Sequence, residues 1–359
     1  MPASRGLRGE ARAKRAKAVA FAGGARAAPT IDDVAALAGV SVATVSRVVN
    51  EKALKRASPV TVAKVREAIA ELDYRPLRAG RVLRTLKSHL VALLIPDITN
   101  AFYSAVAHSV ELAVREIDYA TILCNTDESP DLQDAYLNEM QSHLVRGVLL
   151  LGAVESPGLR RAAANRLPIV YMNRKAPPGL SGPFVGIDNY AAGQAVAVHF
   201  IRQRYERCGA IHGPLHSSAS RERFEGYRDR LAGASVELAA ADIRGGRLTI
   251  ESGYSAAVEL LDGGARPRAI FCANDAMAYG AYQRCRELGL KVPDEVALFG
   301  FDDNPLNQWL APWLSTIHVP HDRFGPAVAR MLCAISGQNG EETPHTILLP
   351  FRLVLRASA

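Results

Sequence analysis

Residues 88–359 alternate between short apolar runs and longer segments whose apolar residues recur at helical spacing. The apolar runs, which predict buried parallel strands, are 90–96, 120–124, 147–151, 168–172, 184–188, 209–213, 269–273 and 296–301. The segments that predict helices are 102–117, 131–144, 190–204, 219–232, 250–262, 275–288 and 321–336. This alternation is typical of doubly wound parallel sheets. About 270 residues are too many for one such sheet, so we expect an α/β body with two lobes.

Polar loops follow the predicted strands. In doubly wound sheets the ligand crevice lies beyond the carboxyl ends of the strands, so these loops are where a ligand site is expected. A neutral polyol binds where amide, carboxylate and guanidinium groups converge beside an aromatic side chain. The loops contain Arg223, Asn274 and Asp302 as the polar set. Phe102 or Tyr103, at the end of P-D-I-T-N-A-F-Y-S, supplies the aromatic surface.

The stretch from Thr30 to Asn50, T-I-D-D-V-A-A-L-A-G-V-S-V-A-T-V-S-R-V-V-N, predicts two short helices joined by a tight turn. Thr30 suits the N-cap of the first helix, and Gly39 suits the left-handed residue at its end. Ser41 suits the N-cap of the second helix, which would bury the side that carries Val45. Read by itself, the pattern fits either a helix-turn-helix that enters DNA or an ordinary helical hairpin in a core.

The other side of the second predicted helix carries small, polar and basic groups, namely Val42, Ala43, Thr44, Ser46, Arg47 and Asn50. Side chains of this size and chemistry suit the major groove. Val42 and Ala43 stand at the start of the helix, where they are expected to set sequence choice. Both are apolar, so we expect contact with thymine methyl groups there.

Charge divides the chain unevenly. Residues 1–88 hold 18 Lys and Arg against 7 Asp and Glu, whereas residues 89–359 hold 25 against 29. A basic N-terminal quarter indicates a polyanion-binding module. Residues 1–28, rich in Ala, Arg and Gly, predict a disordered basic tail. Ser58 and Pro59 predict the start of a third helix that braces the other two.

Several other classes of protein find no support in the sequence. The five cysteines are scattered, which predicts free buried thiols in a reducing compartment. No apolar run approaches the length of a membrane span. There is no G-x-S-x-G, Walker loop, G-x-G-x-x-G or H-E-x-x-H motif. We therefore expect no enzyme, no metal and no cofactor, with an α/β enzyme or a simple sugar-binding protein as the alternatives.

The pattern T-I-D-D-V-A-x-x-A-G-V-S-x-x-T-V-S-R-V-x-N resembles the DNA-binding motif of the lactose-repressor (LacI/GalR) family of bacterial transcription regulators. The body resembles the effector domain of the same family, which shares its fold with periplasmic sugar-binding proteins. The matching motifs are I-P-D-I-T-N-x-F-Y, V-x-I-D-N, S-R-E-R-F-x-G-Y, F-C-A-N-D-x-M-A-Y-G and G-F-D-D. The resemblance implies a small all-α headpiece joined to two doubly wound lobes of the periplasmic-binding-protein type.

The resemblance also implies a division into domains. We expect a helix-turn-helix domain over 29–75, a hinge helix or linker over 76–87 and an effector-binding and dimerisation domain over 88–359. Within the last, one lobe is expected to comprise about 88–187 plus 317–344. The other is expected to comprise about 188–316 plus 345–359.

In the family, the hinge helix orders on operator DNA and wedges a leucine into the minor groove. Leu83 is the matching residue here. Leu77 and Gly80 depart from the family pattern, and glycine costs a helix about 1 kcal/mol relative to alanine. The residues expected to contact DNA are Thr30, Ser41, Val42, Ala43, Thr44, Ser46, Arg47, Asn50, Arg78, Arg81 and Leu83.

The effector-contacting residues that the resemblance carries over are Phe102, Tyr103, Asn173, Arg174, Arg223, Asn274 and Asp302. Four nearby charged residues have structural interpretations too. Asp188 is expected to cap a helix, Asp275 and Asp303 either contact ligand or support strand ends, and Arg221 is a candidate for an ion pair between lobes.

The function implied is that of a cytoplasmic transcription regulator, a repressor, that binds a pseudo-palindromic operator as a homodimer. A small-molecule effector, expected to be a sugar or sugar derivative, would bind between the lobes and change operator affinity. A nucleobase-corepressed regulator of the same family is the alternative.

Overall fold

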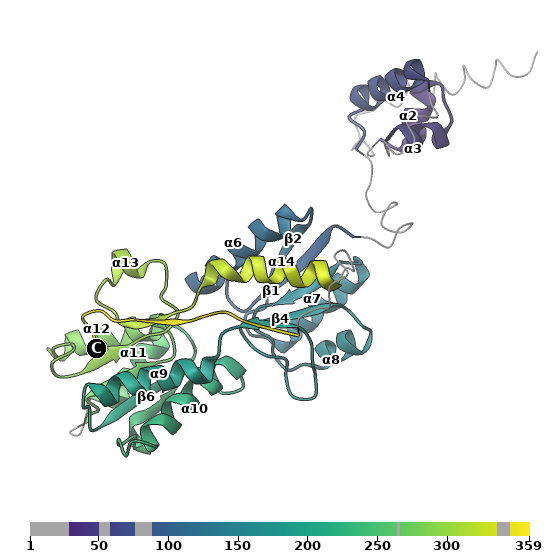
Figure 1. Ribbon diagram of the computed structural model, residues 1–359. Helices are drawn as coiled ribbons and strands as arrows, with labels where there is room; N and C mark the ends of the chain where they lie inside the picture. Colours follow the sequence, from purple (N-terminus) through teal and green to yellow (C-terminus); the bar gives the residue numbers. More distant parts are fainter. Residues whose placement is uncertain (1–28, 50–57, 76–87, 264–265, 336–344) are drawn as a thin grey trace, which may run out of the picture. The chain divides into compact units, whose positions relative to one another are not determined.

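The computed structural model describes residues 29–49, 58–75, 88–263, 266–335 and 345–359. The chain divides into two compact units, residues 1–86 and 87–359 (Figure 1). The described part of the first unit is called the headpiece (residues 29–75), and the second is called the body (residues 88–359). Each is described by itself.

Three helices make up the described headpiece: α2 (Ile31–Ala38), α3 (Val42–Val49) and α4 (Pro59–Glu71). They pack around one small core to which each helix contributes a fully buried valine, Val34, Val45 and Val65. With so small a core, the helix ends must be well capped to define the fold.

The caps of the headpiece are those that the sequence predicts. Thr30 and Asp33 form a reciprocal capping box at the start of α2, and Gly39 ends that helix at φ 65° in the left-handed region. Ser41 Oγ accepts a hydrogen bond from the Thr44 N–H at 3.3 Å at the start of α3. Ser58 caps α4 with Pro59 at its first position. The helix-turn-helix geometry therefore follows from local sequence signals.

The first lobe of the body contains a six-stranded parallel sheet of order β11-β5-β4-β3-β1-β2. Its strands are β1 (Leu90–Ile95), β2 (Ala120–Asn125), β3 (Gly147–Leu150), β4 (Ile169–Met172), β5 (Phe184–Gly186) and β11 (Thr346–Leu348). Its helices are α6 (Ala101–Glu116), α7 (Pro130–Ser142), α8 (Pro157–Ala164) and α14 (Phe324–Ile335), the last preceded by the 3-10 turn η4 (His321–Arg323).

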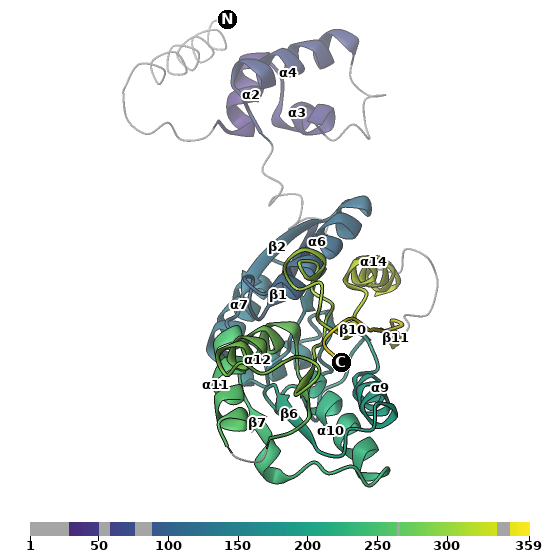
Figure 2. The ribbon, with the colours of Figure 1, turned by 90° about the vertical axis from the view of Figure 1, so that its left-hand side faces the viewer.

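Alternate residues of β1 face opposite sides of the sheet, as strand geometry requires. Leu93 and Ile95 join the core beneath α6 and α14, whereas Leu94 joins the core beneath α7 and α8. Both faces are thus covered by helices, which explains why the strand is apolar throughout. Figure 2 shows α6 and α14 lying on the same side of the sheet.

The second lobe contains a four-stranded parallel sheet of order β7-β6-β8-β9. Its strands are β6 (Cys208–His212), β7 (Ile243–Gly245), β8 (Ala269–Cys272) and β9 (Ala297–Phe299). Its helices are α9 (Asn189–Arg202), α10 (Ser218–Ala232), α11 (Ile250–Leu261), α12 (Asp275–Glu287) and the short α13 (Asn307–Leu310), with a 3-10 turn η3 (Ala240–Asp242) before β7. The predicted α/β class with two doubly wound lobes is confirmed.

The last crossing between the lobes lies later in the chain than the predicted division. That division assigned residues 345–359 to the second lobe, but β11 pairs with β5 in the first-lobe sheet. Only afterwards does the chain form β12 (Arg352–Val354), which pairs antiparallel with β10 (Thr316–His318). The strand β11 is only three residues long, and two of them are exposed. It therefore lacks the buried apolar run by which the other strands of this sheet are predicted.

The cysteines agree in part with the sequence. All five are free, and Cys124, Cys208, Cys272 and Cys285 are buried. Burial raises the pKa of the Cys208 thiol to about 11 and that of Cys285 to about 12. Cys333, on α14, is only partly buried.

Candidate effector site and DNA-reading helix

The helix α3 presents the surface that the sequence predicts for DNA. Val45 and Val48 are buried in the headpiece core, while Val42, Ala43 and Arg47 are exposed. The hydroxyls of Ser41 and Thr44 lie 3.0 Å apart at the start of the helix. Val42, Ala43 and Arg47 therefore lie outside the core, on the face of α3 that is proposed to contact bases.

The remaining DNA-contacting candidates divide into two groups. Thr30 and Ser41 are exposed, and Thr44 and Ser46 are partly buried. Asn50, Arg78, Arg81 and Leu83, with the basic tail 1–28 and the hinge 76–87, lie outside the described residues.

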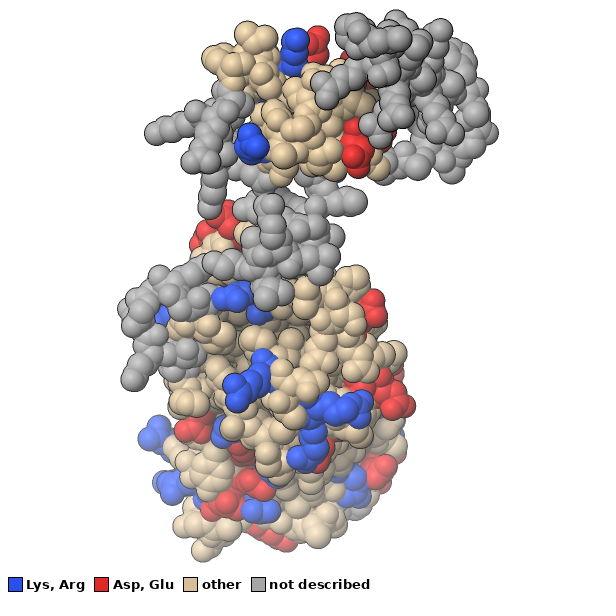
Figure 3. Space-filling model, turned by 90° about the vertical axis from the view of Figure 1, so that its right-hand side faces the viewer, with Lys and Arg blue, Asp and Glu red and all other residues tan. Residues whose placement is uncertain are grey.

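The described headpiece is itself nearly neutral. Its three helices and their flanks carry four Lys and Arg against five Asp and Glu, so the basic excess of residues 1–88 falls in 1–28, 50–57 and 76–88. On the body, the face in Figure 3 shows Lys and Arg side chains beside Asp and Glu side chains. That face offers no extended surface of one charge sign.

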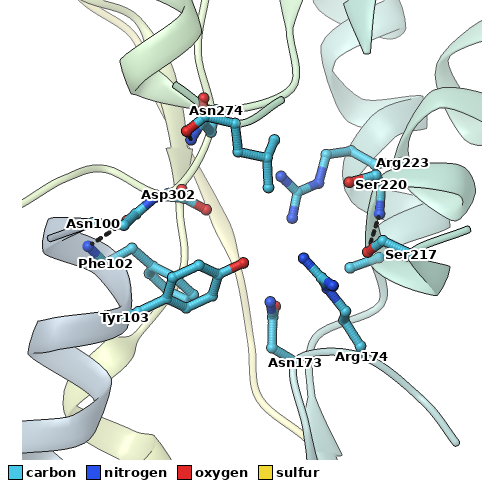
Figure 4. Close-up of a pocket in the computed structure, with 12 residues that line it drawn as sticks. Asn100, Phe102, Tyr103, Asn173, Arg174, Ser217, Ser220, Arg223, Asn274 and Asp302 are labelled. Carbon is cyan, nitrogen blue, oxygen red and sulfur yellow. Dashed lines mark hydrogen bonds between the residues drawn. The ribbon is translucent and has the colours of Figure 1, made fainter. Parts of the chain in front are cut away.

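All seven predicted effector residues line one pocket between the two lobes (Figure 4). The pocket holds about 300 Å³ of space that no atom fills, part of it open to solvent. The first lobe contributes Asn100, Phe102, Tyr103, Asn173 and Arg174, and the second contributes Ser217, Ala219, Ser220, Arg223, Leu248, Asn274 and Asp302. The loops after parallel strands thus meet where the topology predicts.

Arg223 is the central cation of this pocket. Its guanidinium is buried, lies 3.3 Å from the centroid of the Phe301 ring and donates from Nη2 to Asn189 Oδ1 at 3.0 Å. Nη1 donates to the Ala273 carbonyl. Burial lowers its pKa to about 10, an effect that Asp302 partly offsets, so the group remains charged at neutral pH.

Close packing of α9 against α10 fixes the backbone of Arg223. A Cβ atom on Gly193 of α9 would lie 2.0 Å from the Arg223 carbonyl oxygen, and one on Gly226 of α10 would lie 2.1 Å from the Tyr190 carbonyl oxygen. Glycine at both positions lets the two helix backbones approach. The position of the guanidinium therefore depends on residues that never touch the pocket.

Arg174 is the second guanidinium at the pocket. It follows β4 and Asn173, whose φ of 60° turns the chain through the left-handed region. The Arg174 side chain is 1% exposed, and Nη2 contacts Glu128 Oε1 at 2.5 Å. Burial acts to lower its pKa, but Tyr103 and Glu128 outweigh that effect and raise it.

Asp302 and Asn274 complete the polar set. Burial raises the pKa of Asp302 well above its usual range, although the charge of Arg223 opposes that shift. Asn274 has a structural duty as well, since Oδ1 accepts from the Met277 N–H at 2.9 Å and Nδ2 donates to the Leu248 carbonyl at 3.2 Å. It is the N-cap of α12, and only part of its amide remains for a ligand.

The pocket also contains residues that sequence reasoning missed. Asn100 caps α6 and Ser217 caps α10, and with Asn274 on α12 they bring three helix N-termini to the pocket. A signal was present, because each stands in a strand-following loop just before a helical pattern. Ser220 and Leu248 gave no such signal, and their place depends on how α10 and α11 pack.

The nearby charged residues all have structural partners. Asp188 caps α9 through a hydrogen bond from the Ala191 N–H at 2.9 Å. Asp275 and Asp303 support the second lobe and do not line the pocket. Arg221 lies 4.0 Å from Glu225 on its own helix. Among the described residues, the lobes are joined instead by an ion pair of Lys175 with Glu222.

In the described part of the chain, no cluster of three or more His, Cys, Asp and Glu side chains is placed to hold a metal ion. Within the same residues, no helix is both long enough and apolar enough to cross a membrane.

A helix-turn-helix headpiece joined to a two-lobed body with a polar pocket defines a ligand-responsive, DNA-binding regulator as the class of protein. Comparison with known families agrees. Residues 30–76 match the lacI family of bacterial regulatory proteins, and residues 197–359 match a periplasmic binding protein-like domain.

Individual relatives match between 82% and 92% of the chain. The ribose operon repressor of Escherichia coli (strain K12) is 35% identical over 298 residues, 82% of this chain and 89% of that protein. The HTH-type transcriptional regulator DegA of Bacillus subtilis (strain 168) is 32% identical over 333 residues, 92% of this chain and 97% of that protein. A structure of the transcriptional regulator CelR with cellobiose is 31% identical, with a TM-score of 0.69, and covers 92% of this chain and 100% of that one. The chain belongs to the lacI family of bacterial regulatory proteins.

Proposed function

We propose that this protein is a transcriptional repressor whose affinity for operator DNA is set by a small polyol bound between the lobes of the body. The observation that carries the proposal is the convergence of all seven predicted side chains at one pocket. Amide, carboxylate and guanidinium groups stand there beside Phe102 and Tyr103, which is the chemistry that sugar hydroxyls and ring faces require. The names of two similar proteins, a ribose operon repressor and a CelR–cellobiose complex, support a sugar effector.

On the DNA side, α3 enters the major groove, with Val42 and Ala43 against base edges and Arg47 at the backbone or a common base. Arg78, Arg81 and Leu83 act in the hinge, as the family resemblance implies. Two headpieces would bind half-sites about 34 Å apart, because that is one helical turn of DNA.

Two copies of the chain are needed for a pseudo-palindromic operator, and the body offers an apolar surface for pairing. Leu306, Trp309 and Leu310 at α13 are exposed, with Trp309 at 76% and Leu310 at 74%. Exposed apolar side chains in one short segment are typical of protein interfaces. This surface supports the homodimer that the family resemblance implies.

The pocket is proposed to bind its ligand without converting it. It holds no paired nucleophile and base among the residues that line it. A regulator of transcription acts where the DNA is, so we place the protein in the cytoplasm.

Ligand binding and DNA binding are linked reciprocally, since an effector that favours one lobe arrangement must favour or oppose operator binding by the same factor. We take the sign to be release of DNA by the effector. A nucleobase acting as corepressor would reverse it.

The experiment that tests the function measures operator binding by the full-length protein, with its own upstream region as DNA, in the presence of sugars and nucleobases. Sequence-specific binding that weakens with one sugar supports the proposal. Binding that requires a nucleobase supports the alternative, and no preference for the upstream region over random DNA contradicts both.

A further inference from the structure

One nitrogen of the Arg174 guanidinium has no hydrogen-bond acceptor among the described residues. Its side chain is almost fully buried, and Nη2 is taken by Glu128. Nη1 is buried without a hydrogen-bond partner in the described part of the chain. The Tyr103 hydroxyl lies within hydrogen-bonding reach of this guanidinium and raises its pKa, but no hydrogen bond of normal geometry joins it to Nη1. Figure 4 shows the Arg174 guanidinium directed into the pocket.

Arg223 is a buried cation whose direct partners are neutral. Its hydrogen bonds go to Asn189 Oδ1 and the Ala273 carbonyl, and its flat face lies on the Phe301 ring. Among the residues that the structure describes, no carboxylate forms an ion pair with it within 4.0 Å. Asp302, in the same pocket, offsets part of the cost of burying this charge, and an anionic group on a ligand would offset more of it.

The two guanidinium groups share their surroundings with the carboxylates of Glu128 and Asp302 and with three helix N-termini. Burial is the main cause of the lowered pKa of Arg223, and the nearby charge of Arg174 lowers it further. The capping residues Asn100, Ser217 and Asn274 bring the N-terminal ends of three helices to the same pocket. Helix N-termini carry partial positive charge and stabilise anions.

We propose that the effector of this protein carries an acidic group, a carboxylate or a phosphate, which binds between Arg174 Nη1 and Arg223. The inference rests on the proposed sugar-controlled function and narrows its ligand to sugar acids or sugar phosphates. Planar guanidinium groups suit both anions, because each anion accepts paired N–H donors.

The remaining pocket residues fit the rest of such a molecule. Asn173, Asn274 and Asp302 offer hydrogen bonds to hydroxyls, and Phe102 with Tyr103 covers an apolar ring face. A neutral sugar would offer no charged acceptor to Arg174 Nη1 and Arg223, so it is expected to bind less tightly than its acidic analogue.

The first test is calorimetry of the full-length protein with matched pairs of ligands. Hexuronates, hexonates and sugar phosphates are each compared with the neutral parent sugar, and nucleobases are included. At least one acid should bind about tenfold or more tightly than its parent, because a charge-assisted hydrogen bond is worth about 1.4 kcal/mol or more. Carboxylate and phosphate members of the panel distinguish the two sources of negative charge.

The outcomes separate this inference from the function on which it rests. A neutral sugar that binds as tightly as every acidic analogue, or a panel in which no acid binds, overturns the acidic effector. In the first of these cases the sugar-controlled regulator still stands. Binding of a nucleobase in place of all sugars overturns the inference and the proposed effector class together.

The second test uses two variants with opposite expected effects. Arg174→Gln should weaken the acid about 30-fold or more while changing affinity for its neutral parent far less. Glu128→Gln removes the competing carboxylate from Nη2, so it should leave acid binding unchanged or tighten it. If Arg174→Gln weakens the acid and its neutral parent equally, Arg174 has only a structural role and the proposal fails. Because Glu128→Gln keeps the arginine, it remains informative if Arg174→Gln does not fold.

Discussion

The Lys175 ammonium lies 2.7 Å from Glu222 Oε1, and this ion pair joins the first lobe to helix α10 of the second. The Lys175 N–H also donates to Ser218 Oγ at 2.8 Å. Their sequence neighbours Arg174 and Arg223 line the pocket. The two contacts therefore hold the lobes together beside the pocket.

Breaking this ion pair should shift the lobes toward an arrangement with weaker ligand affinity. Lys175 is about half exposed, so the effect is modest, and we expect Glu222→Gln to weaken effector binding about two- to fivefold. Calorimetry measures it. Glu225→Gln is the matched control, because Glu225 faces Arg221 on the same helix and joins no lobes. Equal effects from both variants would contradict the role of the pair.

Arg223→Ala should abolish the response to effector while headpiece binding to DNA persists. The guanidinium is the central donor of the pocket, whereas no described headpiece residue depends on it. Operator binding with and without effector, followed by fluorescence anisotropy, measures both properties. Loss of operator binding by a variant that is still folded would show that Arg223 holds the DNA-binding arrangement instead.

Gly193→Ala should destabilise the body and weaken effector binding together. The added methyl would overlap the Arg223 carbonyl, so α9 and α10 must separate, at a cost of about 1–3 kcal/mol. Chemical denaturation measures the free energy of unfolding, and calorimetry measures the affinity for effector. Gly263→Ala is the control, since nothing lies within 4 Å of that position. A Gly193 variant with unchanged stability would refute the close-packing argument.

Substitution of Val42 or Ala43 by other residues should change which operator sequence the protein prefers. Both side chains are exposed at the start of α3, and neither stabilises the headpiece core. Replacing Val42 by Gln, for example, should favour adenine over thymine at one position of each half-site, because glutamine pairs with adenine in the major groove. Selection from a randomised DNA library reads out the change. A uniform loss of affinity on all sequences would show that these residues do not set specificity.

Asp275 should lower the free energy of unfolding as the pH rises, which is the opposite of the usual effect of an aspartate. Its carboxylate accepts hydrogen bonds from Thr316, Asn304 and Asn307, yet burial raises its pKa from 3.8 to about 6. The folded protein then binds this proton more tightly than the unfolded chain, so the stabilisation present below pH 3.8 is lost as pH rises through 6.

Asp275→Asn removes that titration and loses hydrogen bonds at every pH. The difference in the free energy of unfolding between wild type and variant should therefore move in favour of the variant between pH 4 and pH 6.5, and stay constant above pH 7. Urea unfolding across this range measures it. A difference that does not change with pH would contradict the raised pKa.

Sequence patterns predicted the elements whose signals are local. Buried strands such as β1 and β8 are apolar on both faces, and helices such as α4 and α7 begin at Ser-Pro pairs. Ser156-Pro157 gives the same signal for α8, which was not predicted. Strands β7, β10, β11 and β12 were also missed, because each is short and lacks the continuous buried apolar run that marks the equally short β5 and β9.

The sequence predicts which residues line the pocket, but it does not predict which side chains form ion pairs with them. The resemblance placed seven side chains, since strand-following loops meet in this topology. The ion pairs Arg174–Glu128 and Lys175–Glu222 join residues 46 and 47 positions apart, and no periodicity links them. The same holds for the glycine contacts that fix Arg223, which depend on the angle between two helices.

The three helix caps at the pocket limit how this protein can acquire a new ligand. Asn100, Ser217 and Asn274 each satisfy a backbone N–H at the start of a helix, so exchanging one of them costs about 1 kcal/mol of folding stability before any gain in recognition. Phe102, Tyr103 and Ala219 carry no such capping duty. Divergence of ligand preference among descendants of this chain should therefore accumulate at non-capping positions, and directed evolution is best begun there.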